Sequence, residues 1–165
     1  MALSRIATIV LGYEESDSSR RALERTAVLA QALGARVVVA SVVPALLEVA
    51  TAAATGDPLG PAVAVTAPSP DELAQADRRA VEERSAALEE PVAFLEARGI
   101  SAEPSIRRGE PLDQLLEAAE EHSADLIVVG AEHHSLLERL LGGDLGQRVA
   151  RKARCDVLIV HSDRD

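Results

Sequence analysis

Residues 124–160 read ADLIVVGAEHHSLLERLLGGDLGQRVARKARCDVLIV. This stretch holds two short apolar runs, DLIVVG and DVLIV, with a segment typical of a helix between them, from about residue 143 to residue 153. A strand buried on both faces is apolar throughout, whereas a strand with one solvated face alternates between apolar and polar residues. We therefore predict two buried strands of a parallel sheet, joined by a crossover helix.

The rest of the chain repeats this alternation of apolar strands and amphipathic helices. In a parallel sheet the connecting helices cover both faces, and the crossovers are right-handed. The order therefore predicts one domain, residues 1–165, with a doubly wound (Rossmann-like) five-stranded parallel sheet and helices on both faces. The other predicted strands are residues 6–12, 36–43 and 101–109. The other predicted helices are one within residues 14–35, which offers Ser and Asp caps, one from about residue 71 to residue 98, and the segment that starts at Pro111.

Glycines and prolines mark the expected ends and interruptions of these elements. Gly34 is predicted to end the first helix, and Pro104 indicates an edge strand because proline cannot donate to a central ladder. Pro91 lies inside the second helix and is predicted to kink or break it, since it removes one helical hydrogen bond. Residues 44–70 contain five of the eight prolines and are predicted to form an irregular or mobile loop.

Composition excludes several classes of function. The formal net charge is −10 and the sequence pI is about 4.9, so nonspecific binding to nucleic acid or to anionic lipid is not expected. Aromatic residues make up 1% of the chain, which removes the stacking surfaces of single-strand binders. No apolar run is long enough to span a membrane. The N-terminal apolar run is interpreted as a strand and not as a signal peptide. The single cysteine fits a cytoplasmic protein.

The predicted topology also places the candidate site. In doubly wound sheets ligands bind beyond the carboxyl ends of the strands, near the point where the strand order reverses. The loops there follow the first, second and fourth strands: residues 12–16, the segment from Val42 onward, and residues 130–144.

Three stretches of this chain, IVLGYEESDSSRRALERT, RRGEP and ADLIVVG through LIV, resemble the universal stress protein family in the correct order. The resemblance covers nearly the whole chain and implies an adenine-nucleotide α-hydrolase-like fold. ATP-binding members of that family carry Gly-x-x-Gly, nine residues, and then Gly-Ser or Gly-Thr. Carried over position by position, the resemblance implies six nucleotide-binding positions: Glu14, Val42, Gly130, His133, Gly143 and Asp144.

Several of these positions depart from the family pattern. His133 stands at the second glycine and Asp144 at the hydroxyl residue, while Glu14 and Glu15 stand at an aspartate and a glycine. A carboxylate cannot donate a hydrogen bond to phosphate and repels it. We interpret Asp144 as a helix N-cap whose carboxylate occupies the anion site. In the alternative, a divalent cation such as Mg²⁺ bridges Glu14 and Asp144 to a bound polyphosphate, so Mg²⁺ is expected only if ATP binds.

The resemblance implies a stress-response regulatory protein that is not a catalyst, and we expect its ATP binding to be weakened or lost. It would act as a homodimer through the last strand, Asp156–Val160, and by contact with a protein partner. The edge of that strand invites pairing, and DVLIV is too apolar to remain exposed. The alternative is an ATP- or AMP-binding regulator with a divergent pocket. A nucleotide-hydrolysing enzyme is not favoured, because YEES offers no loop that would activate a phosphate.

The histidines, the cysteine and three serines have simple structural interpretations. The histidines at 122, 133, 134 and 161 lack the spacing of a metal site, and we interpret them as solvated residues. Cys155 follows Arg154, which would lower the thiol pKa, but a packing thiol is the preferred interpretation. The serines at positions 16, 18 and 19 are explained by helix capping.

Overall fold

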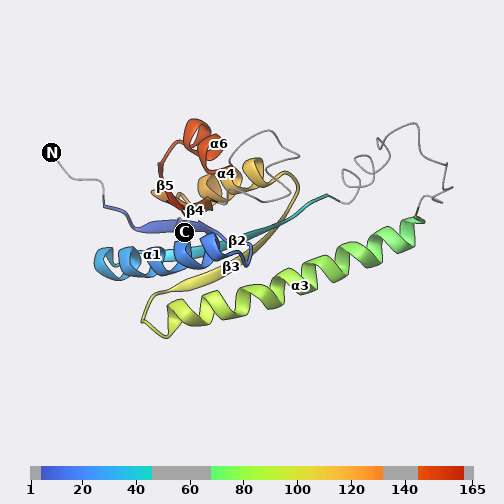
Figure 1. The fold of residues 1–165 in the computed structure, drawn as a ribbon, viewed down its shortest axis with the longest axis horizontal. Coiled ribbons are helices and arrows are strands. Elements are labelled where there is room, and N and C mark those ends of the chain that lie inside the picture. The colour runs from blue at the N-terminus through green and yellow to red at the C-terminus, as the bar shows by residue number, and fades with distance from the viewer. Residues whose placement is uncertain (1–4, 46–67, 132–144, 162–165) are drawn as a thin grey trace.

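The computed structural model describes residues 5–45, 68–131 and 145–161. These residues form a five-stranded, wholly parallel sheet in the order β3-β2-β1-β4-β5, which confirms the predicted fold class (Figure 1). The strands are β1 (Thr8–Gly12), β2 (Arg36–Val43), β3 (Ala102–Arg108), β4 (Leu126–Ala131) and β5 (Asp156–His161). The helices are α1 (Asp17–Leu33), α3 (Pro70–Glu96), α4 (Pro111–Glu121) and α6 (Leu145–Lys152).

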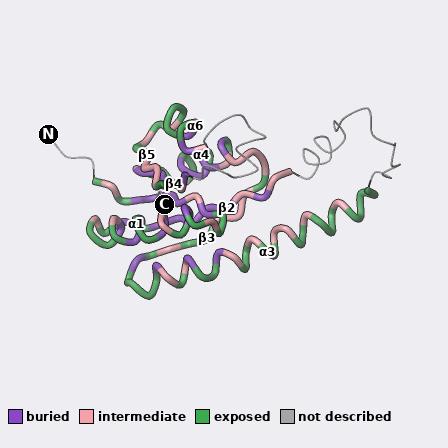
Figure 2. The backbone as a smooth tube through the Cα atoms, viewed as in Figure 1, coloured by how far each residue is buried: buried purple, intermediate pink, exposed green. Residues whose placement is uncertain are grey.

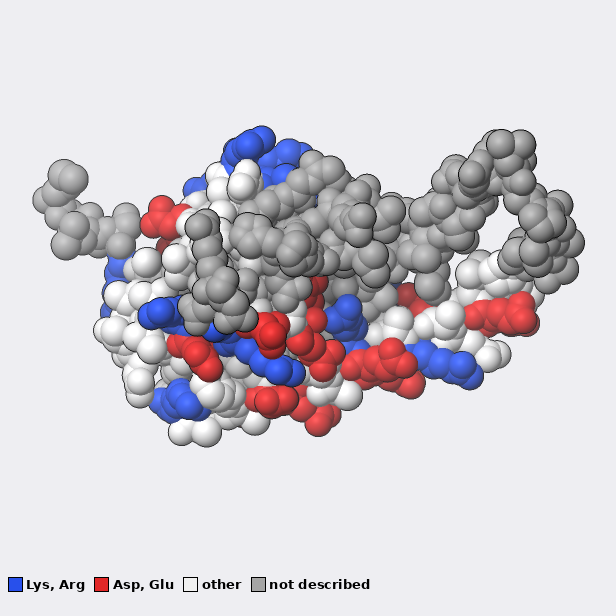
Figure 3. Space-filling view, in the orientation of Figure 1, with Lys and Arg blue, Asp and Glu red and all other residues white. Residues whose placement is uncertain are grey.

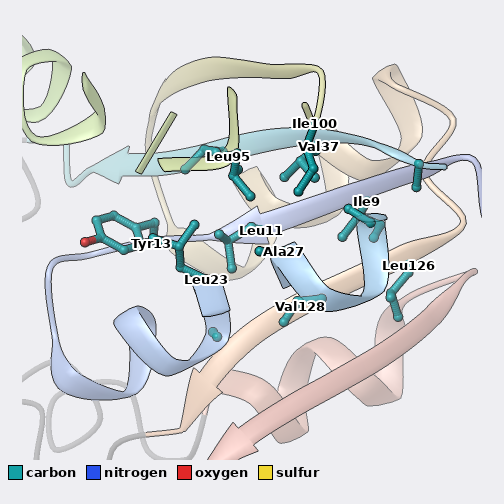
Figure 4. Packing of buried hydrophobic residues seen from close by; sticks show 14 of the residues in the cluster. Ile9, Leu11, Tyr13, Leu23, Ala27, Val37, Leu95, Ile100, Leu126 and Val128 are labelled. Atoms are coloured by element: carbon teal, nitrogen blue, oxygen red, sulfur yellow. The ribbon is translucent and has the colours of Figure 1, made fainter. Parts of the chain in front are cut away.

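The core consists of two apolar layers, one on each face of the sheet. Ile9 and Leu11 belong to the layer under α1 and α3, whereas Val10 belongs to the layer under α4 and α6. Alternate residues of a strand point to opposite faces, so an uninterrupted apolar run fills both layers. Figure 4 shows Ile9, Leu11, Val37, Leu95 and Val128 among the residues of the first layer. The prediction of helices on both faces is therefore correct.

The first helix begins and ends where the sequence predicts. The Ser16 side chain accepts a hydrogen bond from the Ser19 backbone N–H, which caps the helix at its start. Gly34 ends the helix with φ of 67°, in the left-handed region that glycine adopts without a steric cost. The capping interpretation of this serine is therefore confirmed.

Of the two predicted effects of Pro91, a kink or a break, the break does not occur in α3. The helix is continuous from Pro70 to Glu96, so the proline does not break it. Pro91 is buried on the same face as Leu88 and Leu95, and packing against the sheet compensates for the missing hydrogen bond. Helix formation in proteins depends more on such packing than on local preference.

The start of α3 projects beyond the sheet. Ser69 and Glu72 form a capping box there, in which each side chain accepts a hydrogen bond from the other residue's backbone N–H. Figure 2 shows that this part of the helix is mostly exposed, and Figure 3 shows acidic and basic side chains alternating along it. Only the C-terminal half of α3 is therefore held by the core.

The two edge strands are β3 and β5. Pro104 lies in β3, so its predicted edge position is confirmed. Most of the predicted loop at 44–70 lies outside the described residues, and α6 begins within them at Leu145. Among the described helices, none is both long and apolar enough to cross a membrane.

Candidate functional site

A pocket lies beyond the carboxyl ends of β1, β2 and β4, next to the switch between β1 and β4. Three of the six residues implied by the resemblance line it together: Glu14, Val42 and Gly130. His133, Gly143 and Asp144 fall outside the described residues. The structure thus brings together the predicted loops after the first and second strands and the start of the loop after the fourth.

The inner wall of the pocket is apolar. It is formed by Ala40 and Val42 of β2, Leu115 of α4 and Val129 of β4. Small-molecule sites commonly combine such a wall with a few polar groups that fix the orientation of the ligand. The polar groups of the pocket lie on other elements, on the turn after β1, on α1 and on α3.

Gly130 has a packing role that sequence reasoning did not reveal. A Cβ atom at this position would lie 2.6 Å from both the carbonyl carbon and the Oγ atom of Ser18, in the first turn of α1. Real Cβ atoms do not approach other heavy atoms so closely. Glycine is therefore required here for α1 to pack against β4, whatever the pocket binds.

The turn between β1 and α1 is held by its own hydrogen bonds. The Glu14 backbone N–H donates to Ser19 Oγ at 3.2 Å, and Ser16 Oγ donates to Ser19 Oγ at 3.0 Å. Glu15 has φ of 60°, in the left-handed region. This backbone favours glycine, which the resemblance places at this position, and costs another residue roughly 1–2 kcal/mol. The turn therefore keeps the backbone shape of a glycine while carrying a carboxylate.

The pocket also contains a cation that the sequence analysis missed. Arg84 of α3 lines the pocket and is half-buried. Its position follows a pattern visible in the sequence, since Arg84, Leu88 and Pro91 share one face of α3. A basic residue on the inward-packing face of a helix was therefore the sequence signal that could have identified Arg84 as part of the pocket.

Tyr13 lies at the edge of the pocket with its ring in the core. It is 6% exposed. Burial raises the pKa of its hydroxyl, Glu90 raises it further, and a hydrogen bond with Arg20 acts in the opposite direction. A raised phenol pKa means that Tyr13 is neutral at physiological pH and adds no charge to the pocket.

Cys155 fits the packing interpretation. Burial and the neighbouring Asp156 raise the pKa of its thiol, which is the opposite of activation. Arg154, which was considered as an activating neighbour, forms an ion pair with Glu120 at 3.4 Å between Nη1 and Oε1. The thiol is therefore mostly protonated at neutral pH.

The histidines in the described residues do not converge. His122 lies beside Arg36, which opens β2 at the amino end of the sheet, and accepts a hydrogen bond from it through its carbonyl oxygen. His161 lies at the carboxyl end of β5. Within residues 5–45, 68–131 and 145–161, no group of three or more His, Cys, Asp or Glu side chains is arranged to hold a metal ion.

The fold and the pocket define the class of protein: a doubly wound α/β domain with a ligand pocket at its topological switch point. The model of the universal stress protein family matches residues 6–161, so the chain belongs to this family. This confirms the resemblance inferred from the sequence.

Comparison with known proteins gives the same result. The chain is 35% identical to Universal stress protein Rv1636 of Mycobacterium tuberculosis, over 97% of this chain and 99% of that protein. It is 30% identical to a universal stress protein crystallised in complex with cAMP, with a TM-score of 0.64 and coverage of 97% and 100%. The structure of the hypothetical protein MJ0577 has a TM-score of 0.74 at 18% identity, over 98% and 99%, and supports the fold alone.

Proposed function

We propose that this chain is a cytoplasmic stress-response regulator, without a catalytic role, that binds an adenine nucleotide with one phosphate, cAMP or AMP, and holds ATP only weakly. One observation carries the proposal: the pocket combines an apolar wall with only two described charged residues, Glu14 and Arg84. Binding of the nucleotide would change how strongly this chain contacts a protein partner.

The charges of the pocket determine whether it favours a nucleotide with one phosphate or one with three. Glu14 repels phosphate and Arg84 attracts it, so these two side chains together contribute no net charge to the pocket. Asp144 replaces the hydroxyl that donates to phosphate in ATP-binding relatives, and it adds a further negative charge at that position of the sequence. ATP carries the most negative charge of these ligands and is penalised most.

A relative supports the choice of ligand. The protein crystallised with cAMP is 30% identical to this chain over 97% of its length. A cyclic monophosphate carries a single negative charge, which suits a pocket lined by one carboxylate and one guanidinium.

Titration calorimetry of the purified protein with cAMP, AMP, ATP with Mg²⁺, and adenosine tests this proposal. We expect cAMP or AMP to bind at least about tenfold more tightly than ATP, which corresponds to about 1.4 kcal/mol. The ligands that bind should also raise the melting temperature.

The variant that combines His133→Gly with Asp144→Ser serves as the comparison. It restores the family's glycine and hydroxyl and is expected to strengthen ATP binding more than AMP binding. Equal or tighter binding of ATP by the natural chain would contradict the proposal. Release of phosphate above the buffer background would contradict the absence of catalysis.

We also propose that the protein pairs with a second copy through β5, as the sequence analysis expected. The strand lies at the edge of the sheet, and its apolar residues from Val157 to Val160 are only partly buried in the single chain. Val28 of α1 is 65% exposed and lines the same surface hollow as Val160. A second copy placed there would cover both the strand edge and this valine.

Light scattering at micromolar concentration tests the dimer. The natural chain is expected to have the mass of a dimer. Val28→Glu should shift it toward the monomer, because it would bury an unpaired carboxylate in the interface. Val28→Thr, which is similar in size and uncharged, should leave it dimeric. A monomeric natural chain at this concentration would rule the dimer out.

A further inference from the structure

We infer that Arg84 of α3 binds the phosphate of the nucleotide, so that phosphate recognition in this protein depends on a helix outside the glycine-containing loop. This inference rests on the proposed function and specifies the residue that makes its pocket selective.

Two contacts of α3, one before Arg84 and one after it in the helix, hold this residue against the pocket. Leu88, one turn later, is 1% exposed and belongs to the core under α3. Asp77, two turns earlier, forms an ion pair with Arg108 at the end of β3, with 3.2 Å between Oδ2 and Nη2. Residues 77, 84 and 88 share one face of a helix. Arg84 therefore points to the same side as its two anchors.

Among the described residues, Arg84 has no partner that would explain this position. Within the described part of the chain, neither a hydrogen bond nor an ion pair involves its side chain, although it is half-buried in the pocket. Arg107, another partly buried arginine, contacts the carboxylates of both Glu117 and Glu121. A guanidinium withdrawn from water without an anion is unfavourable, and a bound phosphate would supply that anion.

The chemistry of one guanidinium sets the class of ligand. Arginine binds a phosphate through two parallel N–H···O bonds, and its charge balances about one negative charge. The carboxylate of Glu14, exposed at the same pocket, opposes any further phosphate. The pair thus favours one phosphate group and discriminates against a chain of three.

Calorimetry with AMP, cAMP and adenosine, on the natural chain and three variants, tests this role. Arg84→Gln is expected to weaken AMP and cAMP binding by about tenfold or more, since it removes a charge-assisted contact. It should leave adenosine binding unchanged, because adenosine has no phosphate. Arg84→Lys should restore part of the affinity for AMP, since it keeps the charge but loses the two-bond geometry.

The matched control is Arg79→Gln, which removes the same charge from an exposed position on α3. It should bind all three ligands as the natural chain does. An equal loss of AMP and adenosine affinity in Arg84→Gln would show a general structural effect and would overturn the assignment, as would unchanged AMP binding. If the natural chain binds neither AMP nor cAMP, the proposed function itself fails, and that result is distinct from a failure of Arg84 alone.

Discussion

Replacing Gly130 with alanine is expected to lower the free energy of unfolding by about 3 kcal/mol, at the upper end of overpacking effects. The new methyl group would lie 2.6 Å from the carbonyl carbon of Ser18 and 2.8 Å from its carbonyl oxygen. These are backbone atoms of α1, so no side-chain rotation relieves the contact, and the helix must move away from β4. For a chain of this size the melting temperature should fall by roughly 6–12 °C.

Urea denaturation at one fixed protein concentration measures this effect, since dimer formation makes apparent stability depend on concentration. The double variant Gly130→Ala with Ser18→Ala is the informative control. It removes the Oγ contact but keeps both backbone contacts, so it should not recover the lost stability. A stability within about 0.5 kcal/mol of the natural chain would show that Gly130 is not required for packing, and would leave only a ligand-binding role.

Leu88→Ala is expected to lower the free energy of unfolding by about 3 kcal/mol and to weaken AMP binding as well. The side chain is 1% exposed, and truncating a buried leucine costs about 2–5 kcal/mol, depending on how far the cavity collapses. Leu88 is also the first fully buried residue after Arg84 on the inward face of α3. Loosening this anchor should displace the guanidinium from the pocket.

Leu73→Ala provides the matched comparison, because it makes the same chemical change on the projecting, half-buried part of the same helix. Its cost should stay below about 1.5 kcal/mol, with AMP affinity retained. Chemical denaturation gives the stabilities, and calorimetry gives the affinities. Equal costs for the two leucines would mean that α3 is held along its whole length, contrary to the burial pattern.

Much of the fold follows from local patterns. Uninterrupted apolar runs such as residues 8–12 predict buried parallel strands, because only a sheet covered on both faces can bury every residue of a run. Gly34 marks a helix end because glycine adopts the left-handed backbone without a steric cost, and Pro104 marks an edge strand because proline cannot donate to a central ladder. The alternation of these strands and helices predicts a doubly wound sheet, and the pocket lies where the order of its strands reverses.

The residues that form the site were harder to predict from the sequence than the fold was. Glu14, Val42 and Gly130 were found because the resemblance to the universal stress protein family implies nucleotide-binding positions there, and the pocket is lined by all three. Arg84 was missed because it is more than forty residues from any of them, on a helix with many charged residues of both signs and no local motif that singles out one of them. Its role in the pocket depends on how α3 crosses the end of the sheet, and no local periodicity encodes that contact.

The sequence by itself therefore determined the family, the order of strands and helices, and the edge of the sheet at which the pocket lies, because each depends on short-range periodicity and backbone chemistry. Only the tertiary structure decided that α3 passes through Pro91 unbroken, that Gly130 makes room for Ser18, and that Arg84 enters the pocket. The physical reason is the same in each case. The deciding contact joins residues distant in the chain, and its free energy outweighs the preference of the local sequence.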